Sequence, residues 1–199
     1  MAYEVARQLP GVGRKVDGLL VIDLCCPRPN SGLLDETTIN RETDVGITIF
    51  GAAAAVDGLW TSTGLTREHL RAYLFAMRNY HPPAMKAQER PAAAAVIWAE
   101  KGMVNRVKDD PKAMKMLVDN GIPIKAYPGF MEDPNNGPFA CFIPDKTEVD
   151  LGPNGWDKFV GDIMCLSMDA NHLDMPMPGQ VHLLHEQMTK VLDHFSSST

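Results

Sequence analysis

The hydrophobic pattern of the chain alternates between short continuous apolar runs and longer stretches with helical periodicity. The apolar runs predict buried strands in 16–24, in the second half of 92–100 and in 162–168. Apolar residues at helical spacing, or a helix-favouring composition, predict helices over 1–9, 51–60, 66–80, 111–119 and 179–195. Strands that alternate with helices are typical of an α/β fold with a parallel sheet.

The length of 199 residues suits one domain, and the mixed region at about 33–90 is expected to form a lid-like insertion in it. The net charge is −6, and the basic residues are scattered among acids, which argues against nucleic-acid binding. No apolar run approaches the ~20 residues of a membrane-spanning helix. The N-terminal sequence MAYEVARQL lacks the apolar stretch of a signal peptide, so we expect a cytoplasmic protein that does not bind membranes.

The cysteines and histidines do not form a recognisable metal-binding pattern. The four cysteines form no C-x-x-C pair and have no zinc-site spacing, and we expect neither a metal nor a cofactor. His182 and His185 lie three residues apart on the last predicted helix, so a metal site with His172 is conceivable. Because no carboxylate or cysteine completes that set, exposed helix positions are the favoured interpretation.

Polar residues stand at or near the carboxyl ends of the predicted strands, where functional groups collect in open parallel sheets. Asp23 ends the first strand, Glu100 follows the second, and His172 lies four residues beyond the third. A histidine oriented by a carboxylate is the base of a hydrolase triad. Asp23 is the first candidate for that carboxylate and Glu100 the second. In the alternative interpretation, Asp23 caps a helix and His172 lies in an ordinary loop.

Five segments carry a resemblance that extends over nearly the whole chain. They read AYEVARQL, VDGLLVIDLCCP, AAAAVIWAEKG, GPNGWDKFVGD and DANHLDMPMPGQVHLL. In this order and at about this spacing they resemble the thioesterase domains of fungal iterative polyketide synthases, a branch of the α/β-hydrolases. The resemblance implies that His172, within ANHLDM, is the catalytic base and that Asp23 is the triad acid. Leu173 stands where these domains usually have an aromatic residue.

The sequence departs from that family at the nucleophile. In the family, a G-x-S-x-G elbow comes immediately before the segment that resembles AYEVARQL. No G-x-S-x-G occurs among the 199 residues. We therefore expect a truncated α/β-hydrolase-like sheet of about three strands. Its first strand would lie at an exposed edge, and pairing between two copies in a homodimer would complete the sheet.

A base without a nucleophile predicts a lactone-forming polyketide cyclase. We expect His172 and Asp23 to drive α-pyrone formation from a polyketide thioester, with or without a carrier protein, or from a released β-ketoacyl chain, in partnership with a polyketide synthase. The alternative is a non-catalytic thioesterase-like module that docks on a synthase and assists product release. A Cys25 thiol that replaces the serine is a further candidate.

Three further residues are candidates for the lining of a pocket. Tyr3, Trp156 and Met175 are expected to line the substrate pocket. For Tyr3 and Trp156, packing in the core is the alternative that the sequence leaves open.

Overall fold

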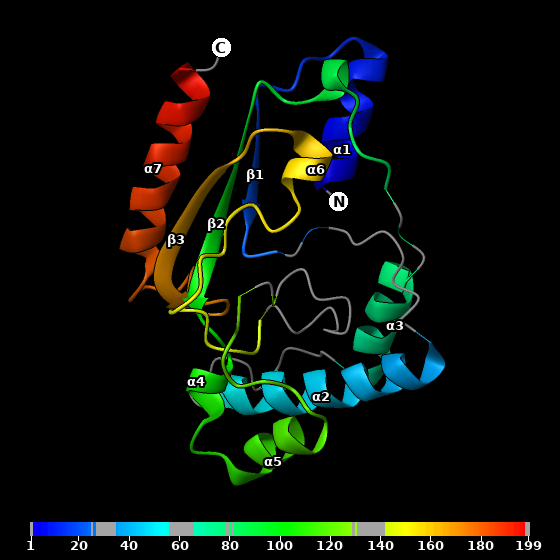
Figure 1. Cartoon of the computed structure of the whole chain (residues 1–199), viewed down its shortest axis with the longest axis vertical. Coiled ribbons are helices and arrows are strands. Elements are labelled where there is room, and N and C mark those ends of the chain that lie inside the picture. The colour runs from blue at the N-terminus through cyan, green and yellow to red at the C-terminus, as the bar shows by residue number, and fades with distance from the viewer. Residues whose placement is uncertain are drawn as a thin grey trace. The chain divides into compact units, whose positions relative to one another are not determined.

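The structure is a computed structural model that describes residues 2–24, 26, 35–55, 66–78, 80, 82–128, 130 and 142–197. The chain divides into two units (Figure 1). The first unit contains Met1–Cys26, Pro82–Glu100 and Leu151–Thr199, and the second contains Pro27–His81 and Lys101–Asp150. The predicted insertion at about 33–90 belongs to the second unit as far as His81 and to the first unit beyond it. A single domain with a lid-like insertion stays a prediction.

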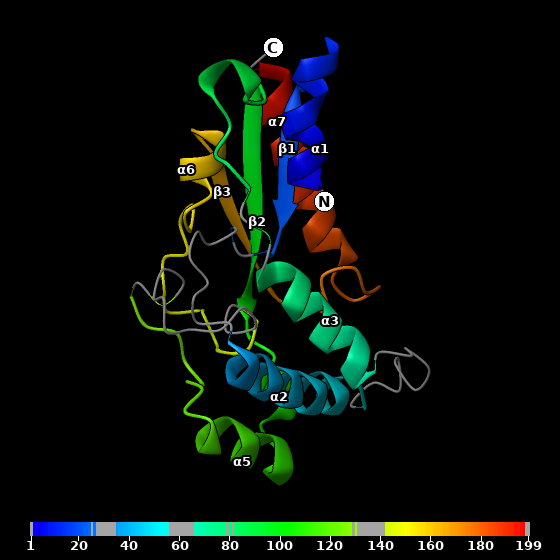
Figure 2. The ribbon, with the colours of Figure 1, turned by 90° about the vertical axis from the view of Figure 1, so that its right-hand side faces the viewer.

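In the described part of the first unit, three strands form the sheet, with β2 between the other two (Figure 2). The strands are β1 (Gly18–Ile22), β2 (Ala93–Lys101) and β3 (Met164–Asn171). The sheet is parallel, and Leu20 of β1 lies opposite Ala95 of β2. The first seven residues of β2 are all buried, because the central strand is covered on both faces. The three predicted strands and the α/β class are confirmed.

The strand boundaries differ from the prediction at two places. Residues 93–101 are strand throughout, although the alanines of this segment favour helix by composition. Strand β3 continues to Asn171, because Ala170 and Asn171 are buried and extend the sheet. His172 therefore follows the strand directly and does not lie four residues beyond it.

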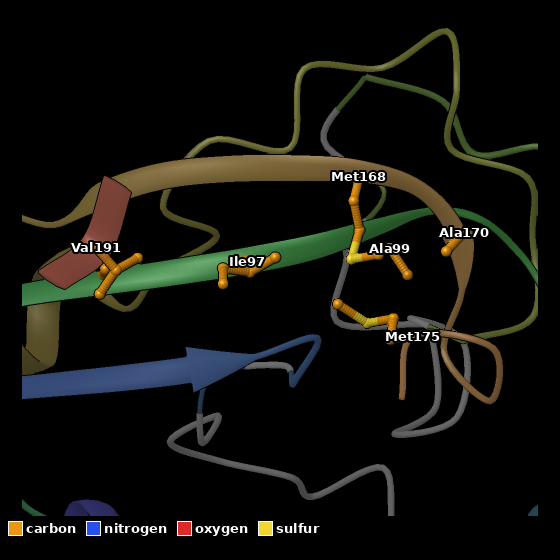
Figure 3. Packing of buried hydrophobic residues seen from close by; sticks show 7 residues of the cluster. Ile97, Ala99, Met168, Ala170, Met175 and Val191 are labelled. Carbon is orange, nitrogen blue, oxygen red and sulfur yellow. The ribbon is translucent and has the colours of Figure 1, made fainter. Parts of the chain in front are cut away.

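Helix α7 (Val181–Ser197) packs on β3 and covers one face of the sheet. The core beneath it contains alternate residues of β2 and β3 together with Val191 of the helix, as Figure 3 shows. The sequence pattern predicts that Val181, Leu184, Met188, Val191 and Leu192 form one apolar stripe on this helix, and that prediction was partly wrong. Val191 is buried and Leu184 packs against the core, whereas Val181, Met188 and Leu192 are exposed.

Helices α1 (Ala2–Gln8) and α6 (Asp157–Val160) lie on the other side of the sheet from α7 (Figure 1). The 3-10 turn η1 (Leu9–Val12) continues α1, and η2 (Ala87–Glu89) precedes β2. An aromatic cluster holds α1 and α6 together. The ring of Tyr3 lies 6.0 Å from that of Trp156 and 5.7 Å from that of Phe159, measured between centroids.

Four helices of the second unit are α2 (Glu36–Ala55), α3 (Arg67–Arg78), α4 (Val104–Val107) and α5 (Pro111–Asp119). Helix α2 packs against the other three. Helices α3 and α5 confirm the predictions at 66–80 and 111–119. The prediction of a short helix at 51–60 was wrong at its start, because α2 begins at Glu36 and buries Ile39, Val45 and Ile49 well before Gly51.

No helix in the described part of the chain combines the length and the apolar character that crossing a membrane requires.

Candidate active site at the carboxyl end of the sheet

Asp23 follows the last residue of β1 and is held there by the backbone of β2. Its backbone N–H donates to the carbonyl of Ile97 at 2.8 Å, and its Oδ1 accepts from the backbone N–H of Ala99 at 3.0 Å. The residue is 1% exposed and has a φ of 39°, in the left-handed region. Aspartate tolerates this conformation better than most residues do. Two bonds to the neighbouring strand thus fix the carboxylate in a buried position.

His172 follows the last residue of β3, at the start of a tight turn. The side-chain oxygen of Asn171 accepts from the backbone N–H groups of Leu173 at 3.0 Å and Asp174 at 3.1 Å. The Asn171 amide also donates to the Asp174 carboxylate. Met175 anchors the end of the turn, because its side chain is buried beside Met168 (Figure 3). The position of His172 is therefore set by hydrogen bonds before it contacts any ligand.

The structure brings these two residues together. Nδ1 of His172 lies 3.0 Å from Oδ2 of Asp23, across 149 positions of sequence. The His172 side chain is 34% exposed, whereas the Asp23 side chain is 1% exposed. When Nδ1 donates to a carboxylate, Nε2 is the ring nitrogen left to accept a proton. The geometry is that of a general base and its orienting acid. A catalytic role for the pair stays a prediction.

Glu100, the second candidate for the carboxylate, has a different contact in the structure. It lies near the end of β2 and accepts a hydrogen bond from the hydroxyl of Ser167 on β3. Oδ2 of Asp23, by contrast, is within hydrogen-bonding distance of His172. The geometry therefore favours Asp23 as the acid that orients the imidazole.

The thiol candidate at this edge lies outside the described residues, since Cys25 is not among them. Its neighbour Cys26 is partly buried. Cys26 lies so close to Gly155 that a side chain at residue 155 would collide with the sulfur atom. The turn at 152–156 therefore packs against the segment that follows Asp23.

The three residues expected to line a pocket are placed in the core. Tyr3 is 5% exposed, and its hydroxyl donates to the carbonyl of Pro83 at 2.6 Å. Trp156 is 3% exposed and donates from Nε1 to the carbonyl of Leu24 at 2.8 Å. Met175 is 2% exposed within the core under α7. These contacts give all three a packing role, and pocket lining stays a prediction for them.

An apolar groove of about 520 Å³ lies away from the dyad, between α1 and β1. Its walls include Val5 and Leu9 on the helical side, and Leu19 and Leu20 on the strand. The groove adjoins the first residues of β1, whereas Asp23 follows the last. It therefore does not hold the candidate base.

No group of three or more His, Cys, Asp or Glu side chains in the described ranges is arranged to hold a metal ion. His182 and His185 are both exposed on α7. The structure therefore gives no support to a site that combines them with His172.

Two asparagines at this end of the sheet were missed by sequence reasoning. Asn171 shapes the turn that carries His172, and the signal for it was an asparagine followed three residues later by an aspartate. Asn154 lies in the turn before Trp156 and has a φ of 47°. Its signal was the segment GPNG, which is typical of a turn.

Comparison with known proteins finds relatives among the non-reducing polyketide synthases of fungi. The chain is 58% identical over 191 residues to the non-reducing polyketide synthase Dhc5 of Alternaria cinerariae, a match that covers 96% of this chain and 9% of that protein. It is 54% identical over 200 residues to the non-reducing polyketide synthase curS2 of Aspergillus terreus, a match that covers 100% of this chain and 10% of that protein. It is 50% identical over 198 residues to the non-reducing polyketide synthase ZEA1 of Gibberella zeae, a match that covers 100% of this chain and 9% of that protein.

The chain thus spans about a tenth of the length of these relatives. No protein-family model and no solved structure matches it. The relatives confirm the resemblance to fungal polyketide synthases that the sequence motifs predicted, and they support a role connected with polyketides. The chain is homologous over its whole length to one segment of the fungal non-reducing polyketide synthases.

Proposed function

We propose that this chain is a thioesterase-like polyketide cyclase that forms an α-pyrone by general base catalysis. The observation that carries the proposal is the 3.0 Å approach of His172 Nδ1 to the buried carboxylate of Asp23. The homology to non-reducing polyketide synthases supports a polyketide as the substrate. It is also consistent with a C-terminal thioesterase or cyclase domain of such a synthase.

The proposed step needs only one proton acceptor. The substrate is a polyketide thioester in which carbon 5 carries an enol hydroxyl. Nε2 of His172 removes the enol proton, and the oxygen attacks the thioester carbonyl at carbon 1. The bond from this oxygen to carbon 1 forms, the bond from carbon 1 to sulfur breaks, and the proton passes from His172 to the departing thiolate. The products are a six-membered lactone and a free thiol.

The dyad is suited to both halves of this step. The Asp23 carboxylate stabilises the imidazolium that exists after the proton is removed. Because the nucleophile belongs to the substrate itself, ring closure benefits from high effective molarity and requires no covalent enzyme intermediate. The chain contains no G-x-S-x-G turn, and the proposed mechanism does not use one.

The direct test is the His172→Ala variant with 3,5-dioxohexanoyl N-acetylcysteamine thioester as the probe. Its cyclisation to 4-hydroxy-6-methyl-2-pyrone is followed by absorbance and by mass, and a reaction without protein gives the spontaneous rate. Wild-type protein should accelerate cyclisation. Loss of the general base should lower the catalysed rate by on the order of 10² to 10⁴.

His185→Ala is the matched control, because it removes an exposed histidine from α7. It should keep the wild-type rate. Equal rates for wild-type and His172→Ala protein would rule out the proposed mechanism. If His172→Ala and Asp23→Asn are both silent while the chain still raises product release from a synthase, the non-catalytic docking module is the better description.

We also propose that two copies associate through the edge of β1. In the described part of the sheet, β1 pairs with β2 only, which leaves its other edge available for pairing. Apolar side chains adjoin this edge, with Val5 53% exposed, Ile22 40% and Leu24 41%. A second copy would cover this apolar surface and the groove beside it.

Light scattering at micromolar concentration tests the association. Wild-type protein should have the mass of a dimer. Val5→Asp should shift it toward the monomer, whereas Val118→Asp, at a position 71% exposed on α5, should not. A monomeric wild-type protein at this concentration would contradict the proposal without affecting the proposed chemistry.

A further inference from the structure

Asn154 has a buried side-chain amide that forms no hydrogen bond within the described part of the chain. The residue is 5% exposed, and among the residues that the structure describes neither its Nδ2 nor its Oδ1 has a partner. Buried donors and acceptors are almost always paired, because leaving them unpaired destabilises the fold. An exception at a defined position therefore requires an explanation.

The conformation of the turn does not supply that explanation. Asn154 has a φ of 47°, and Gly152 and Gly155 in the same turn have φ values of 45° and 83°. Glycine adopts this region without steric cost and would bury no amide. A third glycine would thus form the turn while avoiding two unpaired polar atoms.

The turn is attached to the same end of the sheet as the dyad. The indole N–H of Trp98 on β2 donates to the carbonyl of Gly152 at 2.8 Å. The indole N–H of Trp156 donates to the carbonyl of Leu24, the residue after Asp23, at 2.8 Å. Asn154 lies between these two attachments, in the segment that leads into α6 in Figure 1. In the described chain, Asp23 and Asn154 are the non-glycine residues with positive φ.

We propose that the Asn154 amide binds the enolised β-dicarbonyl group of the polyketide on which His172 acts, an inference that rests on the proposed function. An enolised β-dicarbonyl has one hydroxyl donor and one carbonyl acceptor. A primary amide offers the complementary pair, with Oδ1 accepting from the enol and Nδ2 donating to the ketone. Since both atoms are shielded from solvent, the proposal requires the turn to open before the ligand binds.

The test measures binding separately from catalysis, with heptane-2,4-dione as a probe that contains the β-dicarbonyl but has no thioester. The side-chain amide signals of Asn154 are followed by NMR during a titration, and affinity and melting temperature are measured for each variant. Asn154→Gly keeps a residue that adopts positive φ and removes the amide. Asn120→Gly is the control, because it removes an amide that bonds the carbonyl of Met116 at the end of α5.

We expect the Asn154 signals to shift with the dione. Asn154→Gly should melt no lower than wild-type protein and bind the dione on the order of tenfold more weakly, the loss of two neutral hydrogen bonds. Asn120→Gly should bind as wild-type protein does. Unchanged affinity in Asn154→Gly, or unshifted Asn154 signals, would overturn the inference. The His172→Ala rate with the thioester tests the proposed function separately, since that variant should still bind the dione.

Discussion

Asn in place of Asp23 would change the proton positions on His172 while leaving the shape of the site intact. The backbone N–H of Ala99 donates to Oδ1 of Asp23 at 3.0 Å, so it selects the oxygen of the new amide for that place. The NH₂ group then occupies the position of Oδ2, 3.0 Å from Nδ1 of His172. An NH₂ group only donates, so Nδ1 must become the acceptor and the ring proton must move to Nε2.

The expected effect on activity is much larger than the effect on stability. A protonated Nε2 cannot accept the enol proton, so the rate of pyrone formation should fall by on the order of 10² to 10⁴. The two hydrogen bonds described above, to Ala99 and His172, keep their partners, although both lose the charge assistance of the carboxylate. The free energy of unfolding should therefore fall by only about 1 kcal/mol.

Two assays read these effects independently. Nitrogen-15 NMR of the imidazole ring reports which nitrogen carries the proton, and the thioester probe reports the rate. Asp119→Asn is the control, because it removes an exposed carboxylate on α5 that pairs with Lys115. If Asp23→Asn keeps the proton on Nδ1 and turns over within twofold of wild-type protein, the reasoning about the dyad is wrong.

Two further predictions concern stability. A methyl group added by Gly18→Ala would overlap the ring of Phe195, so the free energy of unfolding in urea should fall by about 1–3 kcal/mol. Gly51→Ala in α2, where an added methyl group meets no other atom, should not lower it. Equal effects of the two substitutions would contradict this packing argument. Burial raises the pKa of Glu42 above its usual value of 4.5 despite the hydrogen bond from Arg41. The folded state therefore loses stability as pH rises above 4.5. Glu42→Gln should be more stable than wild-type protein at pH 7 but not at pH 4. A stability advantage that does not change with pH would refute the raised pKa of Glu42.

Much of the fold could be predicted from sequence, because the relevant signals are local. Continuous apolar runs identified all three strands, and periodicity identified α3, α5 and α7. Local signals failed where contacts between residues far apart in the chain determine the bounds or the buried face of a helix. Helix α2 begins 15 residues before its predicted start, because burial in the second unit stabilises a polar-looking segment. Three of the five residues in the predicted stripe on α7, Val181, Met188 and Leu192, are exposed and do not join the core.

Some features of the candidate site likewise follow from the sequence, whereas others depend on the tertiary structure. The sequence by itself determined that an acid ends the first strand and that a histidine follows the third, and the motif around His172 pointed to polyketide synthases. The tertiary structure decided that β2 lies between these strands, that its backbone holds the Asp23 carboxylate, and that His172 Nδ1 meets that carboxylate. It also decided that the Asn154 amide is buried with no hydrogen-bond partner among the described residues. Strand order and burial depend on contacts between residues far apart in the chain, and a local pattern of residue types does not specify them.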